Sequence, residues 1–240
     1  MSLVLRSSHA THPGARRTYN EDRFVDRPDI GVWAVADGAG GHQAGDVASG
    51  MIAAALEAIP PGLGAQAVLA EIRARIDDVH AKLLEESRRR GPDVMIASTA
   101  VVLCARGPRF ACLWAGDSRA YRLSGGVLEQ ISHDHSLVQE LVDAGQIPAE
   151  AAESHPNANI ITRAVGATDS ETLVLDKATD ELRPGERFLL CSDGLTKSIP
   201  EANIAALLGG ADAANRLIAA ALDRQARDNV TVVVIDVNAA

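Results

Sequence analysis

Five aspartates lie at the edges of apolar runs, and carboxylates placed in this way can do metal chemistry. Asp37, Asp117 and Asp193 each close an apolar run. Asp22 and Asp228 each open one. Because the end of one antiparallel strand lies beside the start of its neighbour, all five can converge on one edge of a core. Crowded carboxylates repel one another unless a cation holds them, and oxygen ligands without a Cys/His set favour Mg²⁺ or Mn²⁺ over zinc. The pattern therefore predicts a hydrolytic site with two metal ions.

The residues beside these aspartates point to a phosphate group. Arg17 stands three residues before the Asn-Glu-Asp run at 20–22, and a guanidinium can bind a phosphate through two parallel hydrogen bonds. Gly38 and further glycines follow Asp37, which lets the chain turn sharply and lets a backbone carbonyl approach a cation. The alternative interpretation is a glycine-rich phosphate-binding loop, but the run lacks the Gly-Lys-Ser/Thr ending of such loops.

Composition bounds the class of protein. With 240 residues and 47% hydrophobic content, the chain can form one large core, and no linker or repeat divides it, so we expect one domain over 1–240. The net charge of −9 and the lack of a basic stripe disfavour a nucleic-acid partner. Three cysteines within apolar runs indicate buried thiols in a reducing compartment. The start of the chain does not resemble a signal peptide, and no apolar run reaches the roughly 18 residues of a membrane span, so we expect a cytoplasmic protein.

The pattern of elements predicts an α+β fold. Apolar runs typical of strands lie near 2–9, 22–27, 30–36, 97–106, 109–115, 119–123, 127–131, 171–176, 186–192 and 230–237. Helical periodicity covers 44–58, 65–89, 136–145 and 212–226. Short turns between neighbouring strands imply antiparallel pairing, so we expect a four-layer α/β/β/α sandwich of two antiparallel sheets flanked by helices. The polar segment at about 132–170 has little strand signal and is predicted to be a flap over the site.

Taken together, the motifs resemble those of the metal-dependent protein phosphatase family (PPM, the 2C type), in its compact bacterial branch. The resemblance covers almost the whole chain and keeps the family's order of motifs. They are Arg-x-x-Asn-Glu-Asp (17–22), Val-Ala-Asp-Gly-x-Gly-Gly-His (35–42), Ser-Thr-Ala (98–100), Gly-Asp-Ser-Arg (116–119), Asp-His-Ser (134–136), Ile-Thr-Arg-Ala-Val-Gly (161–166), Ser-Asp-Gly-Leu (192–195) and Asp-Asn-Val-Thr (228–231).

This resemblance implies a role for each candidate ligand. Asp37 would bridge two Mn²⁺ or Mg²⁺ ions, and the carbonyl of Gly38 would bind one of them. Asp193 and Asp228 would ligate the first ion. Glu21 and Asp22 would act largely through metal-bound waters. Asp117 would share a third, weaker ion with Asp193.

The resemblance also implies the catalytic roles. Arg17 would hold the substrate phosphate while a hydroxide bridging the two ions attacks phosphorus in line. His42 is a candidate acid for the leaving alkoxide. It lies four residues beyond Gly38, whereas the histidine directly follows Asp-Gly in eukaryotic members, so a structural or phosphate-orienting role for His42, or protonation by a metal-bound water, stays open. Of the other histidines, His135 is expected to make structural hydrogen bonds at the base of the flap, and His80 to face solvent.

The predicted function is hydrolysis of phosphoserine and phosphothreonine in proteins, with a Hanks-type kinase and its targets as the implied partners. Three alternatives remain open. The first is a phosphatase of small phosphate esters. The second is a non-catalytic binding module with the same fold, although such proteins usually lose the metal-binding aspartates. The third is a two-metal nuclease, which the missing basic stripe disfavours.

Overall fold

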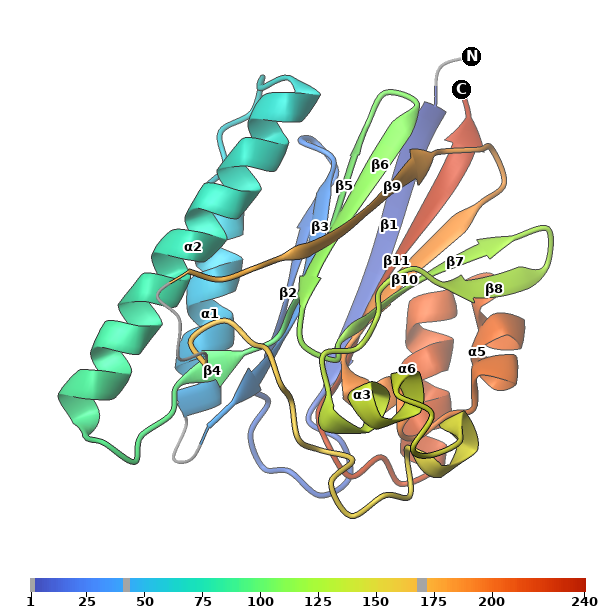
Figure 1. Ribbon diagram of the computed structural model, residues 1–240. Coiled ribbons are helices and arrows are strands. Elements are labelled where there is room, and N and C mark those ends of the chain that lie inside the picture. The colour runs from blue at the N-terminus through green and yellow to red at the C-terminus, as the bar shows by residue number, and fades with distance from the viewer. Residues whose placement is uncertain (1–2, 41–43, 168–171) are drawn as a thin grey trace.

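Two antiparallel sheets pack face to face in the computed structural model, which describes residues 3–40, 44–167 and 172–240 (Figure 1). One sheet has the order β1-β11-β10-β7-β8, formed by Leu3–His12, Val230–Ala239, Arg187–Cys191, Arg119–Ser124 and Val127–Gln130. The other has the order β2-β3-β5-β6-β9, formed by Asp22–Arg27, Val32–Ala39, Ala100–Arg106, Arg109–Ala115 and Asp176–Glu181. A two-residue strand, β4 (Ala97–Ser98), pairs with β3.

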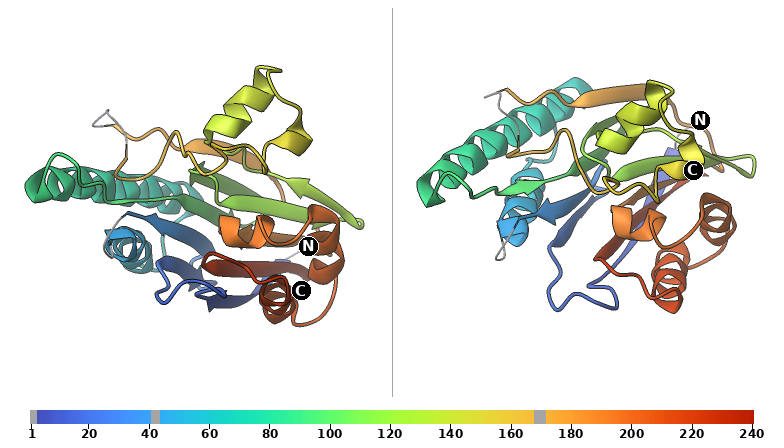
Figure 2. Two further views of the ribbon diagram at one scale, coloured as in Figure 1. Left: turned by 90° about the horizontal axis from the view of Figure 1, so that it is seen from below. Right: turned by 60° about the horizontal axis from the view of Figure 1, so that its bottom comes forward.

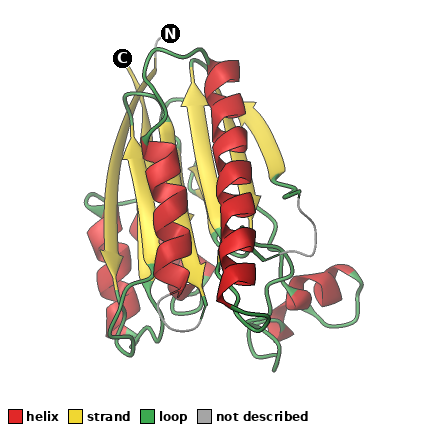
Figure 3. Cartoon of the chain, turned by 90° about the vertical axis from the view of Figure 1, so that its left-hand side faces the viewer, coloured by secondary structure: helices red, strands yellow, loops and turns green. Residues whose placement is uncertain are grey.

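Helices cover the outer face of each sheet, which gives the four predicted layers (Figure 3). The helices α1 (Ala44–Glu57) and α2 (Ala65–Arg90) pack on the sheet that contains β3. On the other sheet lie α5 (Glu201–Leu208) and α6 (Ala213–Asp223). Within the described residues, no helix combines the length and the apolar character that crossing a bilayer requires.

Strand alternation explains why three separate apolar layers form. Along β3, Val32 and Ala34 pack with the two helices, whereas Trp33 and Val35 face the opposite sheet. Successive strand residues point to opposite faces, so a strand that is apolar throughout is buried on both sides. The inner layer is completed by strand residues of both sheets, including Leu103, Phe188, Leu190, Val233 and Ile235.

Most predicted elements are confirmed, and α2 shows why. Its apolar stripe recurs every three or four positions. Five of the six predicted stripe residues are buried against the sheet, namely Val68, Ile72, Ile76, Val79 and Leu83, and Leu69 is partly buried. His80 is the exception, because the prediction that it faces solvent is wrong. Its ring is buried, and its Nδ1 accepts a hydrogen bond of 2.9 Å from the backbone N–H of Gly166. The loop that contains Gly166 thus provides a hydrogen-bond partner for the His80 ring, which lies at the edge of the apolar stripe of α2.

The predicted strand at 171–176 is wrong within its described part, because β9 begins only at Asp176. β9 carries alternating half-buried and exposed residues, and within the described ranges it is an edge strand paired with β6. Leu173 and Leu175, which gave the strand signal, are instead buried against the α1–α2 layer. The sequence also failed to predict two helices, α5 and the short α4 (Asp193–Thr196).

The predicted flap contains two short helical segments, α3 (Leu137–Asp143) and the 3₁₀ turn Ala149–Ala151. Its described part, 132–167, lies at one end of the sheets (Figure 2). His135 joins its base to the core: the backbone N–H of Gly116 donates to Nδ1 at 3.1 Å, and the His135 carbonyl accepts from Thr162. The structural role predicted for His135 is therefore confirmed.

Candidate active site

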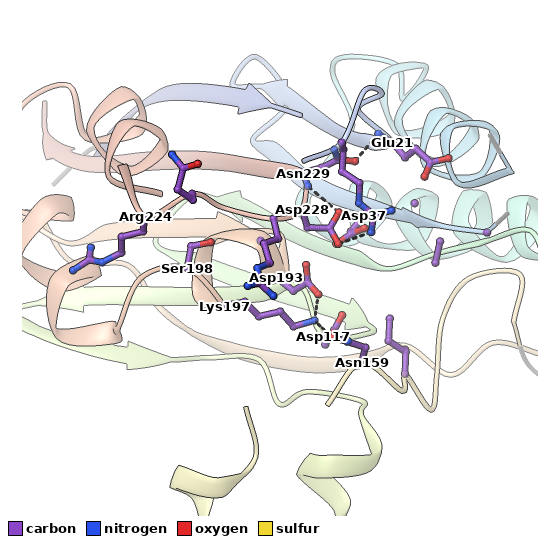
Figure 4. Close-up of a pocket in the computed structure, with 18 residues that line it drawn as sticks. Glu21, Asp37, Asp117, Asn159, Asp193, Lys197, Ser198, Arg224, Asp228 and Asn229 are labelled. Carbon is purple, nitrogen blue, oxygen red and sulfur yellow. Dashed lines mark hydrogen bonds and ion pairs between the residues drawn. The ribbon is translucent and has the colours of Figure 1, made fainter. Parts of the chain in front are cut away.

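A cavity of about 630 Å³ lies at the end of the two sheets that is next to the flap (Figure 4). Seven of the nine residues predicted from the sequence line it: Arg17, Glu21, Asp37, Gly38, Asp117, Asp193 and Asp228. Asp22 is buried and does not line this cavity, and His42 falls outside the described residues. Four of the five strand-edge aspartates therefore meet at this cavity, and the fifth, Asp22, is the cross-strand partner of Asp37.

Asp22 and Asp37 stand directly opposite each other on the paired strands β2 and β3. Like charges in this position repel each other. Asp22 is only 2% exposed, its Oδ2 accepts a hydrogen bond of 2.8 Å from Ser192 Oγ, and its Oδ1 has no partner within the described structure. Burial raises the pKa of Asp22 to about 7, and the negative charges of Asp193 and Asp228 add to this effect.

Asp37 is the carboxylate on which the other charges converge. Burial raises its pKa well above the usual value, and the charges of Asp22, Asp193, Asp117 and Asp228 raise it further. The backbone of Asp37 is fixed by two neighbours. Its N–H donates to Thr99 Oγ1 at 3.0 Å, and its carbonyl accepts from Ser98 Oγ at 2.9 Å. Thr99 was not singled out from the sequence, although it lies in the quoted Ser-Thr-Ala motif.

Gly38 continues β3 into a contact that excludes any side chain. A Cβ atom at this position would lie 2.2 Å from the carbonyl oxygen of Gly45, at the start of α1, and 2.7 Å from that of Glu21. The glycine therefore allows three backbone segments to meet beside the cavity, as close backbone approach requires. Backbone carbonyls are among the oxygens that hard cations accept as ligands.

Asp117 and Asp193 form the side of the cavity nearest the flap. Asp117 follows β6, is 6% exposed, and has a carboxylate oxygen, Oδ1, without a partner among the residues the structure describes. Burial raises its pKa to about 7, the charge of Asp193 raises it further, and the charge of Lys197 opposes both. Asp193 begins α4, and its carboxylate pairs with the Lys197 ammonium.

Arg17 and Asp228 form the opposite side, where Arg17 Nη2 lies 2.8 Å from Asp228 Oδ2. Asn229 holds the loop that carries Arg17. Its Nδ2 donates to the carbonyls of Pro13 and Tyr19 at 3.0 and 2.9 Å, and its Oδ1 accepts from the N–H of Glu21 at 2.8 Å. Asn229 was identified from the sequence only as part of a motif, since no local pattern indicates which loop its side chain contacts.

The donor set fits hard divalent cations. It consists of carboxylate oxygens and a backbone carbonyl. Among the described residues, Asp22 and Asp117 each have a buried oxygen without a partner. Burial raises the pKa of both groups, so a bound proton or cation would stabilise them. Within the described ranges, no three acidic, His or Cys side chains meet closely enough to bind one ion by themselves. Two of the carboxylates are held by Arg17 and Lys197 instead, so waters and the Gly38 carbonyl would have to complete the coordination.

Comparison with known families defines the class of protein. A family profile described as Protein phosphatase 2C matches residues 15–228 of this chain. The chain therefore belongs to the protein phosphatase 2C family, and the resemblance seen in the sequence motifs is confirmed.

Two curated relatives show how the chain compares in length. The serine/threonine protein phosphatase PstP of Mycobacterium tuberculosis is 39% identical over 99% of this chain and 46% of PstP. The serine/threonine phosphatase stp of Listeria monocytogenes is 31% identical over 97% of this chain and 96% of that protein. The chain thus spans about half the length of PstP and nearly all of the Listeria protein.

Solved structures share the fold over almost their whole length. PppA, described as a key regulatory component of T6SS in Pseudomonas aeruginosa, has a TM-score of 0.88 and 42% identity, covering 98% of this chain and 99% of that one. The catalytic domain of the serine threonine protein phosphatase PstP, solved with 2 manganese ions, has a TM-score of 0.86 and 36% identity, covering 99% and 100%. The predicted α+β sandwich is confirmed by these likenesses and by the observed layers.

Proposed function

We propose that the protein is a phosphatase that hydrolyses phosphoserine and phosphothreonine in proteins and depends on Mn²⁺ or Mg²⁺. The observation that carries this proposal is the meeting of four aspartates from separate elements in one cavity, where the Arg17 guanidinium is paired with one of them, Asp228. Membership of the protein phosphatase 2C family supports it, as do relatives named serine/threonine phosphatases and a related catalytic domain solved with manganese.

Each residue has a part that follows from its chemistry. Two divalent cations, when bound, would neutralise phosphoryl oxygens and supply a nucleophilic water at neutral pH. Asp37, Asp193 and Asp228 would hold them, with the Gly38 carbonyl as a backbone ligand and Glu21 and Asp22 acting through ordered waters. Arg17 would leave Asp228 once an ion binds there, and its guanidinium would then orient the substrate phosphate. His42 remains the candidate acid for the leaving oxygen.

The setting of the enzyme is part of the proposal. We take 1–240 as one catalytic domain, with 132–170 as a flap over the cavity. Phosphoproteins are the substrates that the family implies, and a Hanks-type kinase would be the natural source of them. Cys104, Cys112 and Cys191 are all buried free thiols. Free thiols support action in a reducing compartment such as the cytoplasm.

Activity on a peptide panel tests the function. The purified protein should release phosphate from phosphoserine and phosphothreonine peptides with Mn²⁺, lose this activity in EDTA, and regain it when Mn²⁺ or Mg²⁺ is restored. Para-nitrophenyl phosphate serves as the small-ester control. A preference for the small ester would favour the alternative phosphatase, and full activity in a chelated, metal-free sample would refute metal dependence. Inactivity on every substrate with Mn²⁺ bound would favour the non-catalytic binding module.

A further inference from the structure

Lys197 lies at the junction of the candidate active site and the flap. It follows α4, one helical turn after Asp193, and its Nζ pairs with the Asp193 carboxylate. The same ammonium donates a hydrogen bond of 2.7 Å to Oδ1 of Asn159, in the flap (Figure 4). One cation therefore joins a carboxylate of the site to the segment that covers it.

The surroundings of Lys197 mark it as more than a surface ion pair. Asp117, Asp193 and Lys197 all line the main cavity, and all three also line a second cavity of about 60 Å³ beneath the flap. Lys197 thus stands between the two cavities, beside the pair of carboxylates. The buried Oδ1 of Asp117 has no hydrogen-bond partner in the described structure, so this pair still has capacity for a further cation.

We propose that the Lys197 ammonium occupies the cation position beside the Asp117–Asp193 pair and that a third divalent ion must displace this ammonium to bind there. The displacement breaks the hydrogen bond to Asn159 and so releases the flap. The proposal rests on the proposed function, because it concerns the weaker third ion of the same site. Lys197 is then a positioning residue: it couples the occupancy of one ion site to the position of the flap.

The physical properties of lysine suit this role. Its charge sits on a flexible four-carbon stem, so it can leave a carboxylate without moving the backbone. Its side chain is 37% exposed, which gives it a route to water, whereas that of Asp193 is 15% exposed. A partly exposed ion pair is weak enough for a divalent cation to displace. Because coupling between two events is reciprocal, a flap held by Lys197 must also weaken the binding of the third ion.

Titration calorimetry with Mn²⁺ tests the competition. In Lys197→Met the third ion should bind about tenfold more tightly than in the wild type, or should appear where the wild type shows only two ions. The two tight sites should not change. Lys197→Arg keeps a cation within reach and should restore the weak third site to within about threefold of the wild type. Lys177→Met, on the exposed face of β9, removes the same charge elsewhere and should have no effect.

Hydrogen exchange of the amides at 157–162 tests the coupling to the flap. In the wild type, exchange should accelerate when Mn²⁺ fills the third site. In Lys197→Met it should be fast before that ion is added and should not respond to it. Asn159→Ala should also exchange fast from the start. By reciprocal coupling it should tighten the third site, but by no more than about threefold, because the Lys197–Asp193 pair is intact.

The outcomes separate this proposal from the proposed function. Two tight ions in every protein, with the same third-ion behaviour in Lys197→Met and the wild type, would overturn the role of Lys197 and leave the phosphatase proposal standing. An equal gain in third-ion affinity in Lys177→Met would show that the effect comes from net charge alone, and would also overturn the role of Lys197. Absence of the two tight sites from the wild type would refute the proposed function, and this inference with it. Lys197→Gln provides the same readout if the methionine variant does not fold.

Discussion

Replacing Asp22 with asparagine should change how the stability of the metal-free protein depends on pH. Relative to the wild type, the free energy of unfolding of Asp22→Asn should be higher at pH 8 than at pH 5. Burial raises the pKa of Asp22 from 3.8 to about 7, so the folded protein keeps a proton that the unfolded chain has lost. The folded state then binds more protons than the unfolded state, and stability falls as the pH rises between these two values. From pH 5 to pH 7 the loss is about 2–3 kcal/mol, at roughly 1.36 kcal/mol for each pH unit.

Asparagine has no such titration, which makes the difference between the two proteins informative. Its side-chain oxygen can still accept the hydrogen bond from Ser192 Oγ. Its amide group would place a donor where Asp22 Oδ1 has no partner among the described residues, at a cost of about 1–3 kcal/mol. That cost is the same at every pH and cancels when the stability difference between the proteins is compared at two pH values.

Urea unfolding in EDTA at pH 5 and pH 8 measures this double difference. The stability of Asp22→Asn relative to the wild type should rise by about 2–3 kcal/mol between the two pH values. Asp77→Asn, at an exposed position of α2, is the control and should show no such change. Saturating Mn²⁺ should abolish the pH effect, because the ion replaces the proton. A stability difference that is constant from pH 5 to pH 8 would refute the reasoning.

Three further predictions concern the cavity. Asp37→Asn should lower kcat by more than about tenfold (about 1.4 kcal/mol) with an unchanged circular dichroism spectrum, and a smaller loss would exclude a bridging role. Arg17→Lys should raise KM for phosphopeptides by about tenfold, because an ammonium cannot reproduce the planar fork, while calorimetric Mn²⁺ affinity stays unchanged; unaltered kinetics would place Arg17 outside the phosphate site. Asn229→Leu should lower the free energy of unfolding by about 2–4 kcal/mol, since three hydrogen bonds are lost, and should weaken Mn²⁺ binding. Full stability in urea would contradict the role of Asn229 as the anchor of the loop at 13–21.

The sequence predicted the parts of the fold that depend on local periodicity. β2 and β6 have the predicted bounds, and the buried stripe of α2 follows its spacing of three and four residues. The aspartates were identifiable because each follows or precedes an apolar run, and antiparallel pairing brings such ends together. For Asp22 and Asp37 the structure shows this directly, as the two are cross-strand partners.

Partners that are distant along the chain could not be predicted. His80 was expected to face solvent, because local periodicity cannot reveal a hydrogen bond to Gly166, which is 86 residues away in the sequence. Asn229 binds carbonyls more than 200 residues distant, at Pro13 and Tyr19. Lys197 follows the Ser-Asp-Gly-Leu motif, but only the folded flap shows that its ammonium also reaches Asn159. In each case the residue type permitted several roles, and the tertiary contact selected one of them.

The same contacts explain why so many carboxylates are tolerated in one place. Two aspartates opposite each other on adjacent strands, one of them buried, destabilise a sheet, and a selection for stability alone would remove one of them. Here Arg17 and Lys197 neutralise the two outer carboxylates, Asp228 and Asp193, whereas Asp22 and Asp117 keep unpartnered oxygens within the described structure. A divalent ion present at 100 times its dissociation constant would stabilise the folded state by about 2.7 kcal/mol, which is enough to offset a penalty of the size expected for Asp22. We therefore expect a cation among the inner carboxylates to stabilise them, and we propose that the outer ones exchange a side-chain cation for a metal ion when the site fills.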